Sequence, residues 1–134
     1  MKNLNLTTIT QKVTLPASPT EVYEAFTDPE KHSQLTESKA TGKPKVGGKF
    51  TAWDGYIYGK FLELEAGKRL VQEWQTIDWA EGYPPSRLEL TFKEVTAGTE
   101  VTLVHSNVPK EQEEELTDGW NEYYWKPLKE NLKK

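Results

Sequence analysis

Residues 111–132 read EQEEELTDGWNEYYWKPLKENL, and this stretch decides the fold. Its apolar residues recur at spacings of three and four, the period of an α-helix with one broad apolar side. Glutamates crowd the first turns, where carboxylates favour the helix dipole. Pro127 removes one backbone hydrogen bond and predicts a bend near the end. The apolar side comprises Leu116, Trp120, Tyr123, Tyr124, Leu128 and Leu132.

The residues ahead of this helix read as a run of strands joined by short turns. Asp54-Gly55 is a strong hairpin pair because both residue types tolerate positive φ. Alternation of apolar and polar residues is clearest over 87–94 and 100–106. Short turns imply antiparallel neighbours. The expected strands are 38–41, one that follows the turn at 46–50 and ends at Trp53, 56–64, 69–78, 87–94 and 100–106.

The N-terminal part predicts one more strand and two short helices. Residues 7–15 alternate as a half-buried strand does. Ser18 can cap a helix that begins at Pro19, and Glu21 completes a capping box. Asp28 before Pro29 ends that helix and caps a second one, which we expect to run through Leu35.

This order of elements predicts a single α+β domain that spans residues 1–134. Runs of strands followed by a helix are typical of α+β folds rather than parallel α/β folds. A sheet with one apolar face must cover that face, and the long aromatic helix is the only predicted element large enough. We therefore expect a curved antiparallel sheet of about six or seven strands, wrapped around the C-terminal helix.

Composition narrows the function. The chain has 134 residues and no cysteine, so it forms no disulfide. Its net charge of −4 argues against nucleic acid as a partner. No apolar run approaches the ~18 residues of a membrane span, and the start lacks the apolar core of a signal peptide. We expect a cytoplasmic protein. Two histidines and no cysteine exclude a histidine-rich metal site, and no cofactor motif is present, so neither metal nor cofactor is expected.

Four stretches give the chain a resemblance to a known family. They cover residues 19–27, residues 47–50 with Asp54-Gly55 and Gly59, residues 70–74 with 79–82, and residues 119–125. Together they resemble the helix-grip, or START-like (SRPBCC), superfamily, which includes birch-pollen allergens and polyketide cyclases. More closely, they are similar to the C-terminal domain of activators of the heat-shock protein 90 ATPase. The resemblance extends from about Thr8 to Leu132.

The resemblance implies the helix-grip fold, with any ligand held between the sheet and the long helix. It also implies a chaperone contact. The eukaryotic activators carry a separate N-terminal domain ahead of this one, so contact is expected rather than ATPase stimulation by this domain alone.

Several residues are candidates for the wall of a ligand pocket between sheet and helix. Aromatic side chains suit such a wall, but they would equally fill a solid core by packing on each other. Both alternatives stay open. The candidates are Trp53, Tyr58, Trp74, Leu88, Phe92, His105, Trp120 and Tyr124.

The polar residues on apolar faces each allow two interpretations. His105 could act as a general base in a cavity, but it is more simply a core residue satisfied by hydrogen bonding. Gln72 could contact a ligand or lie at a bulge. His32 follows a turn and is expected to be solvated.

A loop and the start of the long helix are candidates for partner contact. Trp79 and Tyr83 lie in a predicted loop, where exposed aromatics would mark a contact site. The alternative is a loop folded back over the sheet. Glu111 to Glu115 could recruit a basic surface, or could simply form a solvated helix start.

Three functions remain. The first is a non-catalytic binding module, related to stress or chaperone function, that contacts a chaperone or client protein. The second is an intracellular carrier or sensor of an apolar small molecule, such as a lipid, polyketide or flavonoid. The third is a cyclase-like enzyme, for which His105 is the only acid–base candidate. We expect no enzyme activity.

Overall fold

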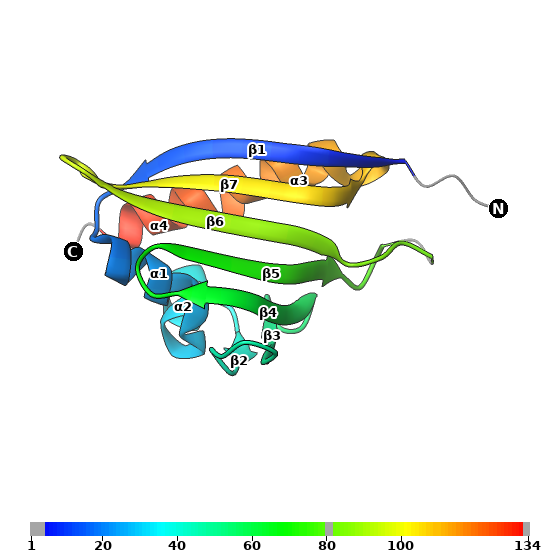
Figure 1. The fold of residues 1–134 in the computed structure, drawn as a ribbon, viewed down its shortest axis with the longest axis horizontal. Helices are drawn as coiled ribbons and strands as arrows, with labels where there is room; N and C mark the ends of the chain where they lie inside the picture. The colour runs from blue at the N-terminus through cyan, green and yellow to red at the C-terminus, as the bar shows by residue number, and fades with distance from the viewer. Residues whose placement is uncertain (1–4, 80–81, 133–134) are drawn as a thin grey trace.

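The computed structural model describes residues 5–79 and 82–132, which form one seven-stranded antiparallel sheet with helices on one side. The strand order is β1-β7-β6-β5-β4-β3-β2. Figure 1 shows one face of the sheet toward the viewer and the helices behind it. The strands are β1 (Leu6–Leu15), β2 (Thr41–Gly42), β3 (Lys49–Ala52), β4 (Ile57–Glu65), β5 (Arg69–Thr76), β6 (Ser86–Val95) and β7 (Gly98–Pro109).

Two short helices follow β1, and a continuous helical segment follows β7. Ser18 caps the first helix, and the capping box with Glu21 is present as predicted. Asp28 caps the second helix by accepting from the amides of Glu30 and Lys31. The helices are α1 (Pro19–Thr27), α2 (Pro29–Thr36), η1 (Lys110–Gln112), α3 (Glu113–Gly119), η2 (Trp120–Trp125) and α4 (Lys126–Asn131). The predicted α+β helix-grip architecture is confirmed.

Some predicted boundaries need correction. The strand expected over 38–41 is only the two-residue β2, because Thr41 and Gly42 alone pair with β3. The strand expected to reach Asp78 ends at Thr76, where a turn follows. The strand expected to end at Ser106 continues to Pro109, because β1 pairs with it as far as Leu6. These corrections concern strand pairing, which local alternation does not reveal.

The core lies between the inner face of the sheet and the helices. Inward residues of β6 and β7 alternate with half-buried ones, and together with those of β5 they form the core with the helical rings. Gly59 of β4 must lack a side chain, because a Cβ there would lie 1.8 Å from the carbonyl oxygen of Glu73. This close approach leaves room for Phe50 and Phe61, whose rings pack beside it with centroids 5.4 Å apart.

The outer face of the sheet carries ion pairs and no covering helix (Figure 1). Arg69 lies between Glu63 and Glu89, and its Nε is 2.7 Å from the Glu89 carboxylate. Arg87 lies near the same two glutamates, with N–O separations of 3.4 and 3.9 Å. Exposed pairs of this kind stabilise a fold by at most ~1 kcal/mol each. Across the described ranges, no helix combines the length and apolarity that a membrane crossing requires.

Candidate functional site

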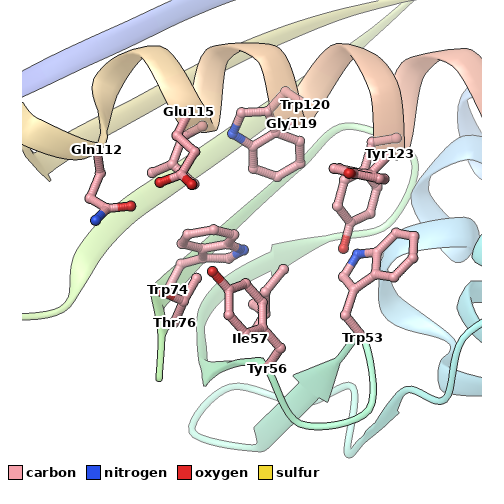
Figure 2. Close-up of a pocket in the computed structure, with 12 residues that line it drawn as sticks. Trp53, Tyr56, Ile57, Trp74, Thr76, Gln112, Glu115, Gly119, Trp120 and Tyr123 are labelled. Atoms are coloured by element: carbon pink, nitrogen blue, oxygen red, sulfur yellow. The ribbon is translucent and has the colours of Figure 1, made fainter. Parts of the chain in front are cut away.

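A cavity of about 410 Å³ lies between the C-terminal helical segment and one end of the sheet. Side chains from β4, β5 and the turn after β3 face others from η1, α3 and η2 across it (Figure 2). The volume falls within the ~300–1,000 Å³ typical of small-molecule sites. The lining residues are Trp53, Tyr56, Ile57, Trp74, Thr76, Gln112, Glu115, Leu116, Gly119, Trp120, Tyr123 and Tyr124.

Trp53 reaches the cavity from the turn that joins β3 to β4. Trp53 and Asp54 have φ of 54° and 58°, in the left-handed region, which costs a non-glycine residue roughly 1–3 kcal/mol. The Trp53 ring meets the rings of Tyr123 and Tyr124 edge-on, with centroids 5.6 and 6.0 Å away. Packing on the helix therefore offsets the strain of the turn and fixes the indole at the cavity wall.

The wide turn η2 determines which rings of the helix face the sheet. The amide of Lys126 donates to the carbonyl of Asn121, five residues back, as in a π-helix. Pro127 follows at once; it lacks an N–H, and in an α-helix its ring would crowd the carbonyl four residues earlier. The predicted bend at Pro127 thus takes the form of a π-helical turn. This turn buries Trp120, Tyr124 and Trp125.

His105 lies beneath two indoles and is fully buried. The Trp120 indole N–H donates to His105 Nδ1 at 3.3 Å. The proton of the neutral ring therefore sits on Nε2, which lies 2.7 Å from Ser86 Oγ and donates to it. The Ser86 hydroxyl in turn donates to the carbonyl of Trp74. Burial lowers the pKa of His105 to about 3. Both ring nitrogens are engaged, and the ring does not line the cavity.

His32 is buried, so the expectation that it is solvated is wrong. Its ring meets the stacked rings of Phe26 and Tyr124 edge-on, and its Nε2 is 3.1 Å from the Tyr124 hydroxyl. Helix α2 packs against α4, which turns His32 inward. Burial lowers the pKa of His32 to about 4 and raises that of Tyr124. Both groups are therefore neutral at pH 7.

The two buried histidines predict that the fold loses stability in mild acid. Their folded-state pKa values of about 3 and 4 lie below the unfolded value of about 6.5, so the unfolded chain binds protons first. The contribution of the neutral histidines to the free energy of unfolding is fully present above pH 6.5. It is lost as the pH falls toward their folded-state pKa values. Between pH 7.5 and 5, each histidine should account for a loss of about 2 kcal/mol.

Urea unfolding at these two pH values measures that loss. Carboxylates titrate mainly below this window, so the histidines dominate it. His32→Gln should remove about half of the pH dependence. Equal unfolding free energies at pH 7.5 and 5 would contradict the burial of both rings as neutral groups.

Two carboxylates lie at the cavity: Glu115 lines it, and Asp78, outside the lining, bonds two residues of the wall. The Tyr56 hydroxyl donates to Asp78 Oδ2 at 2.7 Å, and the Thr76 hydroxyl donates to Oδ1. Hydrogen bonds from Thr76 and then Tyr56 lower the pKa of Asp78, which is ionised. Burial, followed by the hydrogen bond to Asp78 and the charges of Asp78 and Glu115, raises the pKa of Tyr56. The negative charges of Glu115 and Asp78 therefore both act on Tyr56, which lines the cavity.

The structure places four of the predicted pocket residues in the cavity wall: Trp53, Trp74, Trp120 and Tyr124. Leu88 and His105 lie deeper in the core. Leu88 instead borders a second void of only about 20 Å³, together with Gln72. Gln72 pairs with Phe61, beside a β-bulge in β4, which is the bulge position that the sequence left open.

Two predicted pocket residues lie elsewhere. Tyr58 points to the outer face of the sheet and is 38% exposed, because its neighbour Ile57 points inward and strand side chains alternate. Phe92 is buried at the opposite end of the sheet, where it packs edge-on against Tyr23 of α1, with centroids 6.1 Å apart. Both predictions are wrong for the same reason: an aromatic residue type does not reveal which face of the sheet, or which end of it, the side chain occupies.

The predicted contact loop folds back rather than projecting outward. Trp79 packs against Trp74 with ring centroids 6.1 Å apart, and its Nε1 is buried with no acceptor among the described residues. Tyr83 is half-buried, and burial, followed by the nearby negative charge of Glu111, raises its pKa. Tyr83 therefore lies near the start of the helical segment. The rest of the predicted contact stretch, at 80–81, lies outside the described residues.

Sequence reasoning missed most of the helix side of the cavity. Gln112, Glu115, Gly119 and Tyr123 line it at spacings of three or four residues. These spacings continue the stripe of Trp120 and predict one helix face. A search for polar and small residues on that face would therefore have found them.

A family model and curated relatives match most of the chain. The family model described as Activator of Hsp90 ATPase homolog 1-like protein matches residues 16–133. The human "Activator of 90 kDa heat shock protein ATPase homolog 1" is 34% identical over 124 residues, covering 92% of this chain and 36% of that protein. The chain thus spans about a third of the length of the curated relatives it matches.

Solved structures share the fold. The crystal structure of an HSP90 activator from Plasmodium falciparum has a TM-score of 0.74 at 30% identity, covering 91% of both chains. The solution structure of the Aha1 dimer from Colwellia psychrerythraea has a TM-score of 0.80 at 19% identity and covers 95% of this chain and 96% of that one. By this match over residues 16–133, which comprise the strands β2 to β7 and the helices, the chain belongs to the family of Activator of Hsp90 ATPase homolog 1-like proteins.

Proposed function

We propose that this chain is a non-catalytic, chaperone-related binding module that contacts a 90 kDa heat-shock chaperone. The observation that carries the proposal is the family match over residues 16–133, which comprises this domain alone. Because the chain spans about a third of its curated relatives, the proposal extends to contact and not to full ATPase stimulation. The absence of cysteine fits a reducing compartment, and we expect the contact to occur in the cytoplasm.

The uncovered outer face of the sheet is the surface proposed for this contact. Tyr58 is exposed there, and the side chain of Arg87 is 39% exposed. Tyrosine and arginine are the residue types that most often dominate protein interfaces. The outer face carries both residue types. Glu63 and Glu89, which pair with Arg87, could exchange these ion pairs for pairs with a charged partner surface.

Titration of the purified 90 kDa chaperone from the same organism into this chain, by calorimetry, tests the proposal. We expect saturable binding that the pair of substitutions Tyr58→Ala and Arg87→Glu weakens at least tenfold. Tyr123→Ala, an exposed tyrosine on the helix side, is the matched control and should bind normally. Absence of binding by the parent chain would reject the function, and unchanged binding by the double variant would reject this face.

A second candidate function is binding of an apolar small molecule, favoured by the 410 Å³ aromatic cavity. Cavity and filled core coexist: the deeper rings pack on each other, while the cavity occupies one end. The cyclase-like alternative lacks this support, because His105, its only named acid–base group, does not line the cavity and is fully bonded.

Replacement of Gly119 tests the second candidate. A Cβ at Gly119 would meet only the Tyr123 ring, at an ordinary 3.8 Å, so Gly119→Ala should fold and keep the cavity. Gly119→Leu should project into the cavity and fill it. With 2-naphthylacetamide as probe, we expect binding by the parent and by Gly119→Ala, and at least tenfold weaker binding by Gly119→Leu. Equal binding by both variants would place the probe elsewhere.

A further inference from the structure

We propose that the cavity selects small molecules that join an apolar body to a positive charge, such as a protonated or quaternary amine. The body would lie among the rings, and the charge would lie at the mouth beside Glu115. This inference rests on the second candidate function and names the chemical class of its ligand.

The charge of the wall is the first support. Among the described residues that line the cavity, Glu115 is the only carboxylic acid, and no lysine, arginine or histidine accompanies it. Figure 2 shows its carboxylate extending from the helix toward the opposing side chains of the sheet. Asp78, ionised and bonded to Tyr56, adds a second negative charge beside the wall. An anionic ligand would meet two carboxylates without a compensating cation.

The aromatic lining is the second support. Aromatic faces attract cations through their quadrupoles, and the attraction grows when water is excluded. Tyr56 is 40% exposed and lies close to both carboxylates, whereas the exposed Tyr123 lies beside Trp53 at the other end of the cavity (Figure 2). Six of the lining residues carry such rings: Trp53, Tyr56, Trp74, Trp120, Tyr123 and Tyr124.

The state of the ring donors is the third support. An anion needs hydrogen-bond donors, but three lining rings already have hydrogen-bond partners within the protein. Trp120 donates to His105, and Tyr56 donates to Asp78. The Tyr124 hydroxyl shares a hydrogen bond with His32 Nε2, 3.1 Å away. These three groups are occupied within the protein, and a cation, unlike an anion, needs no donor from the wall.

Three probes that share a naphthyl body test the selection: protonated 2-(2-naphthyl)ethylamine, neutral 2-naphthylacetamide and anionic 2-naphthylacetate. Calorimetric titration at low salt should give the tightest binding for the amine, at least tenfold tighter than the amide, and the weakest for the carboxylate. Glu115→Gln should weaken amine binding about tenfold and leave amide binding within twofold. Glu114→Gln, an exposed neighbour that does not line the cavity, is the control and should leave both unchanged.

The outcomes separate this inference from the function on which it rests. Amide binding that equals amine binding, and that Gly119→Leu abolishes, would overturn charge selection while retaining the cavity as a binding site. An unchanged amine-to-amide ratio in Glu115→Gln would also overturn it. Absence of binding by all three probes would overturn both the selection and the second candidate function, whereas the chaperone titration would stand independently.

Discussion

Replacing Trp120 with alanine should lower the free energy of unfolding by about 4 kcal/mol, the middle of the range for a buried tryptophan. Trp120 is 3% exposed, and its ring centroid lies 4.8 Å from Tyr124 and 5.8 Å from both Trp74 and Trp125. The substitution would remove packing between helix and sheet at their centre. It would also leave His105 Nδ1 without its donor, and an unsatisfied buried acceptor adds to the loss.

The matched control is an aromatic residue of the same helical turn. Tyr123 is 60% exposed, so Tyr123→Ala should cost less than about 1 kcal/mol. Urea unfolding followed by circular dichroism measures both variants at pH 7.5. Losses of similar size would mean that Trp120 is not the residue that joins the helix to the sheet.

Local patterns in the sequence were sufficient for most of the fold. The stripe through Trp120 and Leu128 predicts the C-terminal helix, because 3.6-residue periodicity survives whatever the helix packs against. Ser18 with Glu21, and Asp54 with Gly55, predict a helix start and a turn, since each depends on residues adjacent in the chain. The antiparallel order follows from the short turns between strands.

The features that the sequence did not predict depend on contacts between distant segments. His32 is buried because α2 packs on the C-terminal helical segment, although its own neighbours are polar. Tyr58 faces outward because side chains alternate along β4 and Ile57 takes the inward position. A shift of one residue along the strand would place Tyr58 on the inner face. The strand β2 is short because its pairing with β3 ends after Gly42.

The sequence predicted an aromatic wall for the cavity, but not the shape of the cavity. Trp53 and Trp74 were expected in its wall because large rings gather between helix and sheet in helix-grip proteins. The outline depends on the π-helical turn before Pro127, which sets the positions of Trp120 and Tyr124. Proline predicts a disturbed helix, but not whether the helix kinks or widens. The empty volume beside Gly119 follows from that choice.

Removal of the helix tests the claim on which fold and site both depend, namely that the C-terminal segment completes the core of the sheet. A chain that ends at Val108 would lose the rings that cover Leu88, Leu103 and His105, and these side chains are at most 1% exposed in the intact protein. Exposing so large an apolar face should leave too little burial to offset the entropy of ordering the sheet.

Urea unfolding of this truncated chain, followed by near-ultraviolet circular dichroism, is the most direct measurement. We predict no cooperative transition and no near-ultraviolet signal from Trp53, Trp74 and Trp79, the tryptophans that remain. A cooperative transition with that signal retained would show that the sheet folds without the helix, and would contradict both the core and the cavity described above.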